Sequence, residues 1–152
     1  MITCYRIAVT DTLDATLTTE QSTVDDSGTY TVYAMNDAGE ATSSAAVSVL
    51  YEHPRFTRPL RDFEIKLKDS TAITCSYVGI PKPVPTWLIS GVKVVDSDRY
   101  RLDIEENTAT LTVHEVAGDD YDKVYACVIS NAIGQEQTTC RLIQKSELSR
   151  IR

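Results

Sequence analysis

Cysteine and histidine are the residue types in this sequence best suited to bind a metal or to act as a nucleophile. The cysteines are Cys4, Cys75, Cys127 and Cys140, and the histidines are His53 and His114. No Cys-x-x-Cys pair occurs, and no histidine stands at ligand spacing from a cysteine, whereas structural zinc sites combine their ligands in such close pairs. The pattern argues against a metal site, and we expect no cofactor.

Catalytic motifs are also missing from the sequence. It contains no glycine-rich phosphate loop, no HExxH, no GxSxG and no kinase signature. Ser27 and Ser130 stand near turns, but no motif places a histidine beside either, as an activated serine requires. Asp119, Asp120 and Asp122 offer carboxylate oxygens that suit calcium, but without a recognised calcium-loop spacing. We therefore expect no catalytic residue and no enzyme in this segment.

Charge and hydropathy argue against two further classes of partner. Residues 1–51 carry seven acidic side chains against Arg6 alone in a chain of net charge −7, which disfavours binding to a nucleic-acid backbone. No apolar run approaches the roughly 18 residues of a membrane span, and the first residues do not read as a secretory signal. No N-glycosylation sequon occurs, which slightly favours the cytoplasm.

An internal repeat indicates which elements position these residues. The first copy reads YRIAV, ATLT, YTV and NDAG, and the second reads YRLDI, ATLT, YAC and NAIG, with spacing equal to within one residue. Apolar residues alternate within the blocks, as at Tyr125, Cys127 and Ile129, and this period of two indicates strands with one buried face. Turn signals between the blocks are typical of an antiparallel sandwich.

Four further strand-like stretches precede the second copy, at residues 62–67, 72–78, 86–90 and 92–95. With the three blocks they give about seven or eight short strands. Trp87 follows Cys75 by twelve positions, and Cys127 lies on another alternating strand. Because proline resists sheet pairing, we expect Pro81, Pro83 and Pro85 in the connection between the second and third strands.

These residues resemble the immunoglobulin superfamily, in particular the I-set domains of giant muscle proteins such as titin, twitchin and obscurin. The motifs that carry the resemblance are Pro54-Arg55-Phe56 before the first strand, Cys75, the run Gly79-Ile80-Pro81-Lys82-Pro83 before Trp87, Leu111, Tyr125-Ala126-Cys127, and Asn131 through Gly134. The resemblance implies an all-β fold, an immunoglobulin-like Greek-key β-sandwich.

The resemblance also implies roles for single residues. Trp87 is expected between the sheets against Cys75 and Cys127, with Leu111 in the core, and Tyr125 is expected to form the family's tyrosine corner by bonding its hydroxyl to nearby backbone. In an oxidising compartment the two cysteines could form a disulfide that stabilises by about 4 kcal/mol. In cytosol they would stay reduced as small buried side chains.

Both copies depart from the family pattern. The first fits the usual Asp-x-Gly-x-Tyr turn before Tyr30, but the second is one residue longer between Leu111 and Tyr125, so we expect a rearranged corner with Asp120 or Asp122 capping the turn. The first copy has Val32 in place of the second cysteine and no counterpart of the early strands.

We therefore expect three segments. Residues 1–51 form the C-terminal half of a truncated immunoglobulin-like domain, residues 52–144 form a complete I-set domain, and residues 145–152 form a tail or linker. The chain is then a fragment of a tandem array in a longer protein. No flexible Gly/Ser linker separates the two copies.

The resemblance implies a structural and protein-interaction module of a large cytoplasmic, sarcomere-associated muscle protein, serving as mechanical spacer and docking surface. Its partners would be filament or sarcomeric proteins and neighbouring immunoglobulin domains. Residues 62–67 and 136–142 are the strands where a partner strand could add, although Lys66, Lys68 and Arg141 favour protected edges. The alternatives are an extracellular adhesion or receptor ectodomain, and a scaffold segment of an immunoglobulin-containing muscle kinase.

Overall fold

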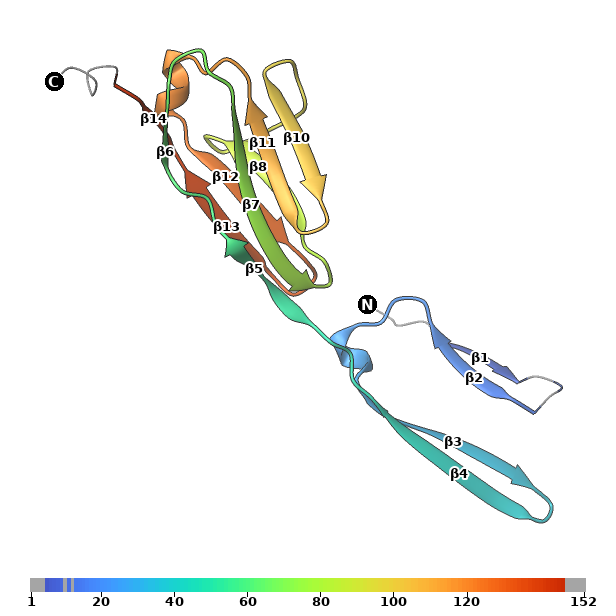
Figure 1. Cartoon of the computed structure of the whole chain (residues 1–152). Coiled ribbons are helices and arrows are strands. Elements are labelled where there is room, and N and C mark those ends of the chain that lie inside the picture. The colour runs from blue at the N-terminus through green and yellow to red at the C-terminus, as the bar shows by residue number, and fades with distance from the viewer. Residues whose placement is uncertain (1–4, 10, 12, 147–152) are drawn as a thin grey trace. The chain divides into compact units, whose positions relative to one another are not determined.

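The computed structural model describes residues 5–9, 11 and 13–146, and the chain divides into two compact units, Met1–Leu50 (unit 1) and Tyr51–Arg152 (unit 2) (Figure 1). Strands dominate both units. Over these described ranges, the only helical segments are two short 3-10 turns, η1 (Val24–Asp26) and η2 (Gly118–Asp122). The predicted all-β class is confirmed.

Unit 2 is a sandwich of two antiparallel sheets (Figure 1). The first sheet has the strand order β10-β11-β7-β5, and the second has the order β13-β12-β8-β9. The strands are β5 (Glu52–Arg58), β6 (Phe63–Ile65), β7 (Thr71–Ile80), β8 (Val84–Ile89), β9 (Val92–Lys93), β10 (Tyr100–Glu105), β11 (Thr108–Val113), β12 (Tyr125–Ser130), β13 (Gln135–Cys140) and β14 (Leu142–Gln144). Because the chain changes sheet between β7 and β8, between β9 and β10 and between β11 and β12, the connections form the expected Greek key.

The core of unit 2 lies between the two sheets and follows the period of two in the sequence. Alternate residues of β7, β11 and β12 are buried, and most of the residues between them are partly exposed to solvent. The buried positions of these strands include Ile73, Cys75, Tyr77, Ala109, Leu111, Val113, Tyr125, Cys127 and Ile129. Trp87 of β8 joins them with 2% of its surface exposed. Burying side chains of this size contributes roughly 1.5–3 kcal/mol each.

A short parallel pair closes one side of unit 2. β6 pairs with β14 in the register Phe63↔Leu142, Glu64↔Ile143 and Ile65↔Gln144. Two further backbone bonds flank the pair, from Phe63 N to Arg141 O (3.4 Å) and from Lys145 N to Ile65 O (3.0 Å). The pair joins the beginning and the end of the unit.

Unit 1 contains two antiparallel hairpins in its described part. β1 (Tyr5–Val9) pairs with β2 (Ala15–Thr19), and β3 (Gly28–Asn36) pairs with β4 (Gly39–Val47). By the internal repeat these strands correspond to β10, β11, β12 and β13 of unit 2. This correspondence agrees with the expectation that unit 1 is the C-terminal half of a sandwich, which stays a prediction.

Residues that match between the two units differ in exposure. Leu17 and Val32 are 48% and 50% exposed, whereas their counterparts Leu111 and Cys127 in unit 2 are fully buried. In unit 2 these counterparts are covered because β11 pairs with β7, and β12 with β8. The described part of unit 1 has no strand that corresponds to β7 or β8, so its apolar inner faces stay accessible.

Three details of the expected strands were wrong. The expected first strand is preceded by a separate strand, so that β5 and β6 open the unit. The expected last strand is divided at Arg141 into β13 and β14. Pro85 lies inside β8 rather than in the preceding connection. Ser90 N bonds to Val124 O, so the backbone N–H and C=O groups of the even-numbered residues of β8 face β12. The nitrogen of Pro85 therefore faces away from β12, and the missing N–H of this proline costs the β8–β12 pair no hydrogen bond.

Candidate protein-interaction site

Cys75 and Cys127, the two residues considered as a possible disulfide, lie in the closed core of unit 2. Cys75, Cys127 and Cys140 are buried free thiols, and Cys4 falls outside the described residues. A hydrogen bond with Cys75 and burial together raise the pKa of the Cys127 thiol, and burial raises the pKa of Cys140 to about 12. A reactive cysteine needs an accessible thiolate, so these thiols are packing groups.

The predicted core residues surround these sulfurs. Trp87 is the register partner of Cys127 on the β8–β12 pair, and Ala109 is the partner of Cys75 on β11–β7. The Cys75 Sγ donates a weak bond to Ala109 O at 3.8 Å. Leu111 and Tyr125 are fully buried in the same layer. The arrangement is a packed interior.

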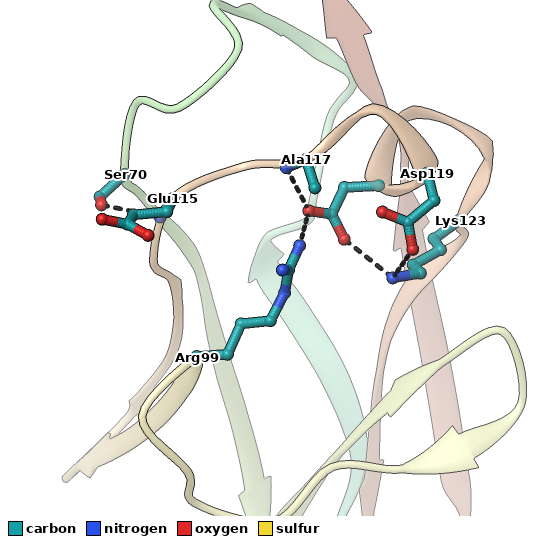
Figure 2. Close-up of polar contacts among 7 residues, drawn as sticks. Ser70, Arg99, Glu115, Ala117, Asp119 and Lys123 are labelled. Carbon is teal, nitrogen blue, oxygen red and sulfur yellow. Dashed lines mark hydrogen bonds and ion pairs between the residues drawn. The ribbon is translucent and has the colours of Figure 1, made fainter.

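The turn that leads into β12 contains the one fully buried carboxylate of the described chain, Asp120. Its Oδ2 accepts a hydrogen bond from Ala117 N at 2.8 Å and pairs with Arg99, and its Oδ1 accepts from Lys123 Nζ at 2.9 Å. Figure 2 shows Arg99 reaching this turn from the residue before β10, whereas Lys123 lies at the end of the turn itself, where Asp119 is also bound to it at 2.9 Å. Asp120 thus caps η2 and ties it to the start of β10.

Electrostatics favour the charged form of Asp120. Burial opposes ionisation, but the Ala117 N–H, Lys123 and Arg99 outweigh it and hold the pKa of Asp120 below its ordinary value. Burial lowers the pKa of Lys123, but its hydrogen bonds to Asp120 and Asp119 outweigh this effect and raise that pKa. Both oxygens of Asp120 are occupied by these donors, and the described residues contain no group of three carboxylate, cysteine or histidine side chains placed to hold a metal.

The tyrosine corner differs between the two units. In unit 1, Tyr30 donates its hydroxyl to Asp26 O at 2.7 Å, and Thr23 N bonds to Asp26 Oδ2 at 2.6 Å. In unit 2 the extra residue separates Asp120 from Tyr125 by five positions. The buried Tyr125 hydroxyl lies beside the Asp120 carboxylate without an ordinary hydrogen bond to a described residue. Burial, and to a smaller extent the negative charge of Asp120, raise the pKa of Tyr125. The expected rearrangement is present, and Asp120 rather than Asp122 caps the turn.

The two strands considered for partner-strand addition, which we expected to be protected edges, close against the rest of unit 2. β6, within residues 62–67, pairs with β14, so that side of it is occupied. Along β13, Glu136 Oε2 accepts from Phe56 N at 2.9 Å, and Thr138 Oγ1 accepts from Leu60 N at 3.0 Å. These contacts, rather than the charges of the nearby lysines and arginine, occupy the edges.

The outer edge of β10 is also covered along part of its length. Leu102 N donates to Asp96 Oδ1 at 2.7 Å, and Tyr100 N donates to Ser97 Oγ at 3.1 Å. Side-chain acceptors thus take the backbone donors that an added strand would need. One edge segment of the first sheet, at the start of β7, lacks such cover and lies beside a groove formed by residues 57–61, 63 and 72–74.

Comparison with known proteins places this geometry in a family. The immunoglobulin I-set domain profile matches residues 3–49 and 54–143. The muscle M-line assembly protein unc-89 of Caenorhabditis elegans is 33% identical over 145 residues, which is 91% of this chain and 2% of that protein. The human leucine-rich repeats and immunoglobulin-like domains protein 1 is 30% identical over 119 residues, 78% of this chain and 10% of that protein.

A solved structure with several immunoglobulin domains in tandem matches both units. The I-band fragment I67–I69 from titin is 30% identical, with a TM-score of 0.65, over 93% of this chain and 49% of that one. The chain spans a small part of the length of both curated relatives. No helix in the described ranges is long and apolar enough to cross a bilayer.

Proposed function

Because the chain belongs to the immunoglobulin I-set family, we propose that it is a structural and protein-interaction segment of a tandem array in a large muscle protein. In this role it spaces neighbouring domains along a filament and presents surfaces to other proteins, without catalysing a reaction. The observation that carries the proposal is the match of both units, within one alignment, to unc-89 and to the tandem titin structure. Partners would be filament proteins and adjacent domains of the array.

The parallel pair in unit 2 supports a mechanical role. β5 precedes β6 in unit 2, and β14 is the last described strand, so tension applied before β6 and after β14 pulls these parallel strands in opposite directions along their length. All backbone bonds between them then resist at once, whereas an antiparallel hairpin pulled from its open end would separate one bond at a time. Asp62 Oδ1 adds a further bond, from Arg141 N at 2.7 Å.

The proposed limits of the segments are residues 1–51 for the half domain, 52–144 for the complete domain and 145–152 for a tail or linker. The division of the chain at Leu50 and Tyr51 supports the first limit, and the profile match that ends at residue 143 supports the second. Within the proposed complete domain, Cys75 and Cys127 are reduced in a cytoplasmic array and bridged in an oxidising compartment.

An extracellular adhesion or receptor ectodomain is the second candidate function. The identity of 30% to the human leucine-rich repeats and immunoglobulin-like domains protein 1 favours it, because this is close to the 33% found for unc-89. The two functions differ in compartment, and therefore in the oxidation state of the buried thiols.

Thiol trapping in native tissue tests the choice. Cells are lysed in denaturant with N-ethylmaleimide, and the peptides that contain Cys75 and Cys127 are quantified by mass spectrometry before and after reduction. An antibody against unit 2 locates the protein in muscle sections in parallel. Alkylated cysteines and a striated pattern are expected. A disulfide between the two cysteines together with labelling of unpermeabilised cell surfaces would favour the ectodomain instead.

A further inference from the structure

The first sheet of unit 2 has a notch where β5 leaves it. β5 pairs with β7 only through Glu52↔Ile80, Arg55↔Val78, Phe56↔Tyr77 and Arg58↔Ser76. After Arg58 the chain crosses toward the second sheet, where Leu60 N bonds to Thr138 Oγ1. β7, however, continues to Thr71, so its first part extends beyond its neighbour on this side.

The backbone of β7 at this notch offers hydrogen bonds that the fold leaves open. On the other side of β7, Tyr77 N bonds to Asn107 O at 2.9 Å, so odd-numbered residues of β7 face β11. Even-numbered residues face the β5 side, which makes Ala72 and Thr74 the next two positions of that ladder. Among the residues the structure describes, no backbone group bonds to the amide or the carbonyl of Ala72 or of Thr74 on this side.

A groove of about 430 Å³ lies over these two residues. Its apolar part includes Leu60, Phe63 and Ile73. Arg58 and Arg61 also line it, both are exposed, and neither forms an ion pair with a described residue. No acidic side chain lines the groove, although the whole chain has a net charge of −7.

We propose that this groove binds a short, extended, acidic peptide segment of a partner protein, which adds to β7 as an antiparallel strand in line with β5. Residues of the peptide opposite Ala72 and Thr74 would exchange backbone hydrogen bonds with them. The residue between would point inward, because strand side chains alternate, and would enter the apolar part of the groove. Flanking carboxylates would meet Arg58 and Arg61.

The charge of the groove selects this occupant over a second copy of the chain. A second copy carries the same net negative charge, and the two copies would repel each other at long range. The groove binds its segment whether or not the chain belongs to a muscle filament, so the inference goes beyond the proposed function and its failure would leave that function standing.

The test uses the full chain and a labelled, end-blocked peptide of sequence EETVTEE, followed by fluorescence anisotropy at low salt. The double substitution Arg58→Ala and Arg61→Ala is expected to weaken binding at least tenfold. Arg101→Ala, which removes an exposed arginine from β10 of the same sheet, is the matched control and should leave the affinity unchanged. The fluorescence of Trp87, the chain's single tryptophan, verifies that each variant is folded.

Peptide chemistry separates strand addition from simple charge attraction. N-methylation of the two threonines removes the donors that face β7 and should abolish binding, whereas N-methylation of the valine, whose N–H faces away, should be tolerated. Equal effects of the two modifications, or equal binding of KKTVTKK, would overturn the proposal. Dimerisation of the chain that Arg58→Ala and Arg61→Ala abolish would overturn it too, in favour of a second copy as occupant.

Discussion

Asp120→Ala should destabilise unit 2 by about 3 kcal/mol. The substitution leaves the Ala117 N–H without its acceptor, at a cost of roughly 1–3 kcal/mol. It also removes the partner of Arg99 and Lys123, and breaking a buried ion pair costs about 3–5 kcal/mol when the remaining charge stays buried. Here the side chains of Arg99 and Lys123 are 38% and 26% exposed and can turn toward water, so the low end of that range applies to the whole network.

Urea unfolding followed by Trp87 fluorescence measures this loss, because the chain contains one tryptophan and it lies in the core of unit 2. At a slope of about 1.5 kcal/mol per molar urea, the midpoint should fall by about 2 M. Asp119→Ala is the matched control: it removes an ion pair of the same Lys123 from a side chain that is 69% exposed, and should cost no more than about 1 kcal/mol.

The pH dependence of the difference provides a second readout. The pKa of Asp120 is lowered in the folded chain, so its contribution is present above the unfolded value of about 3.9 and is lost as the pH falls through the folded pKa. The stabilities of the parent chain and of Asp120→Ala should therefore converge in acid below about pH 4. If the two aspartate variants lose equal stability at pH 7, the buried network does not carry the energy assigned to it.

Three further outcomes follow from the same contacts. Tyr125→Phe should change the stability of unit 2 by less than about 0.5 kcal/mol in the same urea assay, because the lost hydroxyl makes no ordinary hydrogen bond; a loss above 1 kcal/mol would contradict this. The three described cysteines should resist Ellman's reagent in the folded chain and react only in denaturant, and rapid labelling of Cys140 at pH 8 would contradict its burial. Ile143→Pro should lower the unfolding force of unit 2 in a single-molecule pulling experiment, since the parallel register directs Ile143 N to Phe63 O; Ile143→Ala, which keeps the amide, should retain most of that force.

Sequence patterns predicted the interior of unit 2 well because its strands bury one face. The alternation at Ile73, Cys75 and Tyr77 is the direct trace of that burial. The repeat likewise predicted that unit 1 holds the counterparts of β10 to β13. Both signals are local, since each arises from the order of residues within a single strand.

Pairing between distant strands left no such signal. β5 has only Pro54 and Phe56 as apolar residues, and β6 is three residues long, so neither stands out as a strand that occupies an edge. The contacts of Glu136 with Phe56 and of Asp62 with Arg141 join residues about 80 positions apart. The notch at Ala72 also depends on where β5 ends, and this was not predictable from β7 alone.

The parallel pair of β6 and β14 also bears on how the chain folds during its synthesis. Asp62 and Arg141 are separated by 79 positions, and β14 follows directly. Contacts of such long sequence separation slow folding, because the loop between them must be ordered before they can form. Unit 2 therefore cannot close until residue 144 has left the ribosome. Until then the apolar faces of β7 and β11 stay within reach of chaperones and of neighbouring nascent domains.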